Sequence, residues 1–174
     1  MTTWVRLVLL AAVIVSCVGC DQSTKHMASR ELKGRAPMSF LAGTVQLSYA
    51  ENPGAFLSLG ADLPAPLRST LFLVLTSAMV LGLVGAAVAV KSLDAMSVLL
   101  LGLIAAGGLG NLIDRWTLGL ARDFLVLRLG PVHTGIFNVA DIAITLGVLA
   151  LLAVRILKPS RRSLDEEVGP VGSA

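Results

Sequence analysis

Four long stretches of this chain are almost free of charged residues, and each is long enough to cross a lipid bilayer. They cover about residues 4–24, 67–90, 95–115 and 136–157 of 174. A transmembrane helix needs about 20 mainly apolar residues. Only 14% of all residues are charged, against about 25% in soluble domains. The sequence therefore predicts an α-helical integral membrane protein with four transmembrane helices.

The two longer connections, residues 26–66 and 116–135, are more polar and are expected to lie outside the membrane. Val45–Tyr49 alternates apolar and polar residues, which is typical of a short strand. Leu125–Leu129 could add a second strand to the same sheet, and Asn52-Pro53-Gly54 is a turn signal. We therefore expect a small sheet lying on the membrane.

The domain organisation follows from this division. Residues 1–158 are expected to form a single membrane domain. Residues 159–174 contain several charged residues and end in small ones, so we expect a disordered tail.

The first apolar stretch also resembles a signal peptide, because Cys17-Val18-Gly19-Cys20 is similar to a bacterial lipobox. On that interpretation the chain would itself be a cleaved lipoprotein. Against it, Asp21 and Lys25 are four residues apart and lie on one helix face, which indicates a helix that continues through the membrane surface. The two cysteines are then small helix-packing residues, and Arg6 is expected to reach the membrane interface.

The last apolar stretch begins with Phe137-Asn138-Val139-Ala140-Asp141 and so carries a carboxylate at its start. An ionisable group within a spanning segment marks a functional site by default. The alternative is that Asp141 only caps the first amides of a helix, although Asn138 already offers a cap.

Counting the spans brings the unusual polar residues to one membrane surface. The first and third spans end on this surface, the fourth begins on it, and both long loops belong to it. The residues concerned are Asp21, Lys25, Asn52, Asn111, Asp114, Asp123, Asn138 and Asp141. Independent caps and anchors would not converge in this way, so we expect one site at the mouth of the helix bundle. The basic residues do not decide which side of the membrane this is, because they are spread over both.

Several short motifs carry a resemblance to a known family over nearly the whole chain. They are Asp21-Gln22-Ser23-Thr24-Lys25, Asn52-Pro53-Gly54-Ala55-Phe56, the run from Gly107 to Arg115, Asp123-Phe124, and the run from Phe137 to Asp141. In this order, and with these spans between them, they resemble lipoprotein signal peptidase, also called signal peptidase II.

The resemblance implies a multi-pass aspartic endopeptidase of the bacterial inner (plasma) membrane. Such an enzyme removes the signal peptide just before a diacylglyceryl-modified cysteine, and its two catalytic aspartates correspond to Asp123 and Asp141. It also implies cytoplasmic termini and an active site at the extracytoplasmic face. The expected fold then has a small extracytoplasmic β-sheet, or cradle, and a short surface helix beside the four spans.

Other residues are expected to bind substrate or support the two aspartates. They are Asp21, Lys25, Asn52, Gly54, Gly108, Asn111, Asp114, Arg115, Asn138 and Ala140. Asp21 is expected to pair with Lys25 and Asp114 with its neighbour Arg115, because a paired carboxylate stays ionised. Prolipoproteins and membrane phospholipid are the expected partners of a monomer, with no metal, cofactor or nucleic acid.

The chain departs from the family pattern at two places. Ala121 and Arg122 stand where two valines are usual, and Arg122 could lower the pKa of Asp123 or touch lipid phosphate. Ala55-Phe56-Leu57 stands where Ala-Ala-Phe is usual, which affects the lining of the substrate groove. Phe56 and Phe124 are candidates for that groove or for the core.

Other protease chemistries have no matching motif here. There is no His-Glu-x-x-His, the histidines are His26 and His133, and no Gly-x-Ser-x-Gly is present. Two hypotheses from other classes remain open: a small transport or proton-conducting protein, and a structural membrane protein or lipoprotein with capped helices.

Overall fold

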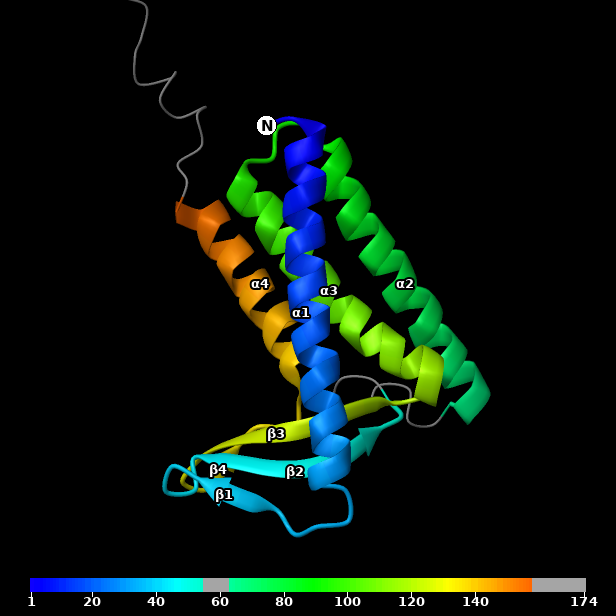
Figure 1. Ribbon diagram of the computed structural model, residues 1–174, viewed down its shortest axis with the longest axis vertical. Helices are drawn as coiled ribbons and strands as arrows, with labels where there is room; N and C mark the ends of the chain where they lie inside the picture. Colours follow the sequence, from blue (N-terminus) through cyan, green and yellow to red (C-terminus); the bar gives the residue numbers. More distant parts are fainter. Residues whose placement is uncertain (55–62, 158–174) are drawn as a thin grey trace, which may run out of the picture.

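The computed structural model describes residues 1–54 and 63–157, and within them the chain forms a four-helix bundle with a small sheet at one end (Figure 1). The helices are α1 (Thr3–Glu31), α2 (Ala65–Ala89), α3 (Ala95–Leu118) and α4 (Val139–Leu157). All four are long and apolar enough to cross a membrane, which confirms the predicted spans. The expected tail at 159–174 lies outside the described residues, as do Ala55, Phe56 and Leu57.

Helix α3 is the centre of the bundle. Half of its apolar stretch is buried, against 11–17% in the other three helices. Glycines allow this close approach: a Cβ at Gly107 would collide with the carbonyl oxygen of Ala140 in α4. A Cβ at Gly110 would lie 2.6 Å from Oδ2 of Asp21 in α1. Small residues at these positions therefore bring α1, α3 and α4 together.

Helix α1 is longer than the predicted span and continues without a break to Glu31. Asp21 and Lys25 lie well inside it, which confirms the prediction of a helix running through the membrane surface. Cys17 is half-buried, but Cys20 is exposed. The expectation that both cysteines pack between helices is therefore wrong for Cys20.

The two extramembrane loops build one antiparallel sheet in the order β1-β2-β3-β4. The strands are β1 (Met38–Phe40), β2 (Val45–Asn52), β3 (Ala121–Leu129) and β4 (Val132–His133). Both predicted strands are present and longer than expected. The central pairing, β2 with β3, sets Ala50 opposite Asp123 and Asn52 opposite Ala121. Residues 1–54 and 63–157 contain no counterpart of the expected short surface helix.

Arg6 was expected to reach the membrane interface, but this expectation is wrong. Its side chain is buried, and its guanidinium donates hydrogen bonds of 2.7–3.0 Å to four carbonyl oxygens. These oxygens belong to the end of α2 and the turn into α3: Ala87, Val90, Lys91 and Leu93. The last carbonyls of a helix lack intrahelical partners, so Arg6 caps α2 from the neighbouring α1.

We predict that Arg6→Met destabilises the bundle by about 2–4 kcal/mol, because the four carbonyls would lose their charged donor. Thermal unfolding of the purified protein in detergent would measure the change. Arg155→Met is the matched control, since Arg155 is exposed near the end of α4. Equal midpoints for the two variants would contradict a capping role for Arg6.

Candidate active site

A buried lysine lies where α1 and α3 meet, at the end of the bundle next to the sheet. Lys25 is fully buried, and its Nζ lies 2.8 Å from Oδ2 of Asp21 and 3.5 Å from Oδ2 of Asp114. It also donates a hydrogen bond of 2.9 Å to Oδ1 of Asn111. Both carboxylates are fully buried as well. The predicted Asp21–Lys25 pair is therefore present and extends to α3.

Asp114 pairs with Arg122 and Lys25 rather than with its neighbour Arg115, so that expectation is wrong. The Arg122 side chain donates from Nη2 to Oδ1 of Asp114 at 2.6 Å and from Nε to Oδ2 at 3.2 Å. The Arg122 backbone amide donates to Oδ2 at 2.9 Å. A planar guanidinium matches a carboxylate in this two-pronged way. Arg122 therefore ties β3 to α3.

The expected action of Arg122 on the pKa of Asp123 is not observed. The Arg122 side chain contacts Asp114 and Gln22 rather than the adjacent Asp123. Its Nη2 donates to Oε1 of Gln22 at 3.1 Å. Hydrogen bonding to Asp114 raises the pKa of Arg122 itself. Asp21, Lys25, Asp114 and Arg122 thus form a buried group with two positive and two negative charges.

Asp21 also holds the start of α4. Its Oδ1 accepts a hydrogen bond of 2.9 Å from the backbone amide of Ala140, in the first turn of that helix. The free amides at a helix N-terminus favour a carboxylate. The carboxylate of α1 therefore fixes the helix that carries Asp141.

Two asparagines connect this group to the two predicted catalytic aspartates. Oδ1 of Asn111 accepts from both Lys25 and Asn138, at 2.9 and 3.0 Å. Nδ2 of Asn111 therefore faces Asp141 and donates to its Oδ1 at 2.8 Å. Nδ2 of Asn138 donates to Oδ1 of Asp123 at 2.6 Å. Both aspartates thus receive neutral amide donors.

Asp123 lies on β3 and is almost fully buried, with 3% of its surface exposed. Besides the bond from Asn138, its Oδ2 accepts a hydrogen bond of 3.0 Å from Nδ2 of Asn52 at the end of β2. Burial raises the pKa of Asp123, and the negative charge of Asp141 adds to this, although the hydrogen bond from Asn52 acts in the opposite direction. Asp123 therefore keeps its proton to higher pH than an ordinary aspartate.

Asp141 is partly exposed. The sequence left two interpretations of this residue, a helix cap and a functional carboxylate, and its contacts are compatible with both. Its Oδ2 accepts from the backbone amide of Asn138, while Oδ1 of Asn138 accepts from the backbone amide of Asp141, each at 3.0 Å. This reciprocal pair is a capping box. Oδ1 of Asp141 is left for Asn111 and for the open side of the site. The cap therefore orients the carboxylate without using both oxygens.

Arg115 approaches the two aspartates from α3. Its charge interacts with those of Asp123 and Asp141. Its hydrogen bonds are long, 3.4 Å each, to the carbonyl oxygens of Asn111 and Gly54, and its buried Nε has no hydrogen-bond partner. Gly54 follows Asn52 in a tight turn, in which Oδ1 of Asn52 accepts from the Gly54 amide.

Two expected site residues lie elsewhere. Gly108 faces α2, because a Cβ there would lie 2.9 Å from Val80. Phe124 is 7% exposed and packs with Ala28 and Leu32, which favours the core alternative. Among the described residues, no group of three His, Cys, Asp or Glu side chains is arranged to hold a metal ion.

Gln22, Gly107 and Gly110 were not among the expected site residues, although each lies in a motif that carries the family resemblance. Nε2 of Gln22 donates to Asp21, to the carbonyl oxygen of Gly110 and to Asp114, at 3.0–3.1 Å. A signal was available for the glycines, since Gly107 and Gly110 lie seven and four residues before Asp114, on its helix face. For Gln22 the signal was its place in the Asp21–Lys25 motif; its partners are Asp21 beside it, Gly110 and Asp114 of α3, and Arg122 of β3.

Comparison with known proteins identifies the family. The family described as Signal peptidase (SPase) II matches residues 13–157. The chain belongs to the signal peptidase II family. It is 37% identical to the lipoprotein signal peptidase of Geobacter sulfurreducens over 154 residues, covering 87% of this chain and 92% of the relative. It is 36% identical to that of Aquifex aeolicus over 164 residues, covering 94% and 93%.

The fold agrees with this assignment. A bacterial membrane enzyme solved by the in meso method at 1.9 Å resolution matches with a TM-score of 0.75 and 25% identity, covering 87% of this chain and 94% of that one. Membership in the signal peptidase II family makes the chain a multi-pass membrane peptidase. The family supports cleavage of signal peptides from prolipoproteins, and so favours the peptidase over the transport and structural hypotheses.

We predict that Arg122→Leu lowers the stability of this peptidase by about 3 kcal/mol, because it leaves the buried Asp114 with one cation instead of two. Denaturant unfolding in detergent would measure the loss. Lys33→Leu is the control, since Lys33, in the turn after α1, pairs with Glu51 of β2 but is exposed, and exposed pairs contribute little. If Arg122→Leu unfolds at the same denaturant concentration as this control, the buried network is not a stabilising unit.

Proposed function

We propose that the chain is an aspartic endopeptidase that cleaves prolipoproteins just N-terminal to a diacylglyceryl-modified cysteine. Asp123 and Asp141 activate the attacking water. The observation that carries this proposal is that both carboxyl groups are bound to one residue, Asn138, at the end of the bundle. One comes from strand β3 and the other from the first turn of helix α4.

The chemistry needs two carboxyl groups in different protonation states. The ionised one takes a proton from water, and the protonated one donates a hydrogen bond to the scissile carbonyl oxygen. The raised pKa of Asp123 suits it to hold the proton. Asp141, which is partly exposed, suits the role of the base that meets the water.

The position of the site fits a lipid-anchored substrate. The two aspartates lie where α4 begins and where β3 leaves the end of α3, so a scissile bond held near the membrane surface can reach them. We propose that this surface is the extracytoplasmic face of the bacterial inner (plasma) membrane, with both termini cytoplasmic. We also propose that the enzyme acts as a monomer surrounded by membrane phospholipid.

We expect Asp123→Asn and Asp141→Asn each to abolish cleavage, because neither variant keeps one ionised and one protonated carboxyl group. The measurement is cleavage of a diacylglyceryl-modified precursor by purified enzyme in detergent. Insertion into the membrane is checked for both variants.

Asp114→Asn is the matched control, since Asp114 is a buried aspartate of the same network but contacts cations rather than the two catalytic candidates. It should lower the rate or the stability without removing activity. Cleavage at a comparable rate by either dyad variant would falsify the proposal. Complete loss of activity in a well-folded Asp114→Asn would move the catalytic role to Asp114.

The pH dependence follows from the raised pKa of Asp123. If the protonated Asp123 binds the scissile carbonyl, kcat/KM falls only as pH rises through this raised pKa. We therefore expect the descending limb above the ordinary aspartate value of about 3.9. A descending limb at or below that value would contradict the assignment of the proton to Asp123.

A further inference from the structure

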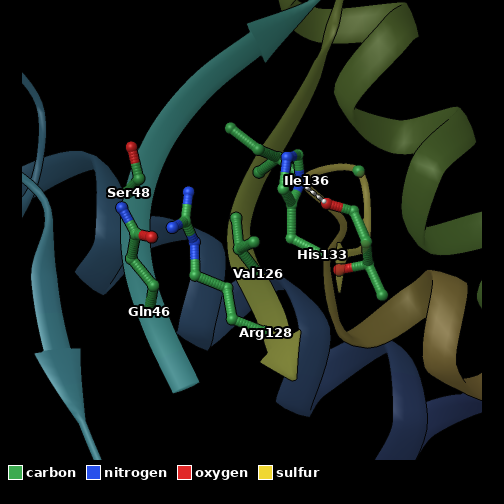
Figure 2. Close-up of a pocket in the computed structure, with 8 residues that line it drawn as sticks. Gln46, Ser48, Val126, Arg128, His133 and Ile136 are labelled. Carbon is green, nitrogen blue, oxygen red and sulfur yellow. Dashed lines mark hydrogen bonds between the residues drawn. The ribbon is translucent and has the colours of Figure 1, made fainter. Parts of the chain in front are cut away.

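A pocket lies on the sheet, away from the two aspartates (Figure 2). It has a volume of about 230 Å³, several times the roughly 30 Å³ that one water takes in the liquid. Its lining comes from β2, β3, β4 and the segment before α4. The main lining residues are Gln46, Ser48, Val126, Arg128, His133 and Ile136.

The pocket is built for an anion. Arg128 and His133 are paired in the β3–β4 register, and Figure 2 shows them on either side of Val126, with the guanidinium beside Gln46 and Ser48. None of the lining residues is acidic. A guanidinium with hydroxyl and amide neighbours matches the oxygens of a phosphate group.

The donors in this pocket are not used by the fold. Within the described part of the chain, no hydrogen bond or ion pair engages the side chains of Arg128, Gln46 or Ser48; the backbone amide of Arg128 donates to the carbonyl oxygen of Thr44 at 2.8 Å. Nδ1 of His133 lies 2.9 Å from the carbonyl oxygen of Thr134. A carbonyl only accepts, so Nδ1 carries the proton; a neutral His133 then has no proton on Nε2 to offer a phosphate oxygen, and the donors left for an anion are those of Arg128, Gln46 and Ser48.

The pocket lies near the level where lipid headgroups are found. Ile136 is three residues before Val139, the first residue of the spanning helix α4. The turn next to the pocket carries Leu129 and Val132, which are 76% and 69% exposed. Exposed apolar side chains beside cationic ones are typical of a surface that meets the membrane interface.

From this arrangement we propose that the pocket binds the phosphate group of a membrane phospholipid, with Arg128 as its main ligand. The bound lipid would hold the sheet against the membrane, and β3 of that sheet carries Asp123. This inference does not depend on the catalytic roles proposed above, because it concerns binding of a lipid at a different place.

The test is lipid binding by the full chain after delipidation in detergent. The probe is dihexanoyl phosphatidylglycerol, and native mass spectrometry measures its apparent affinity. We expect Arg128→Gln to weaken binding about tenfold. Arg30→Gln removes the same charge from the exposed end of α1, outside the pocket, and should bind like the unmodified protein. Thermal unfolding confirms that both variants are folded.

Inorganic phosphate is the second arm, and it separates a lipid site from a general anion site. It should compete with the lipid only at much higher concentration, because it lacks the glycerol and acyl parts. Competition at equal concentration would overturn the lipid assignment. Unchanged affinity in Arg128→Gln, or an equal loss in Arg30→Gln, would overturn the pocket itself.

Discussion

The ammonium group of Lys25 is the charge around which the mouth of the bundle is arranged. It is fully buried, and it has donors but no acceptor. Burial of a lone charge is very costly, so it must be matched by carboxylates and hydrogen bonds. Asp21 and Asp114 supply the charges, and Arg122 balances the second of them. The result is a neutral group that joins α1, α3 and β3.

The same ammonium sets the direction of the hydrogen bonds that reach the two aspartates. Because Lys25 only donates, it must meet the oxygen of Asn111, and the amide nitrogen of Asn111 is turned towards Asp141. Asn138 likewise donates to Asn111 and to Asp123. A cation hydrogen-bonded to the two carboxyl groups would favour ionisation of both; Arg115, whose charge reaches them, donates instead to the carbonyl oxygens of Asn111 and Gly54. Neutral amides orient the carboxyl groups and still allow one of them to keep a proton.

The parts of this fold that depend on one segment at a time could be predicted from the sequence. The four spans follow from length and composition, and counting them brings Asp21, Asn111 and Asp141 to one surface. The assignment of Asp123 and Asp141 as catalytic residues came from the resemblance and not from spacing. Partners that depend on how each helix is rotated were not predictable. Two such predictions were wrong for this reason. Asp114 pairs with Arg122 instead of the adjacent Arg115, and Arg6 caps α2 instead of reaching the interface.

The central claim is that Asp123 and Asp141 form one electrostatically coupled pair. The most direct measurement is the pKa of Asp123, determined by a pH titration with carboxyl ¹³C NMR. The aspartate-labelled protein is titrated in detergent with and without the substitution Asp141→Asn. Removal of the negative charge of Asp141 should lower the pKa of Asp123, because that charge helps to raise it. An unchanged pKa of Asp123 would show that the two groups titrate independently and would contradict the account.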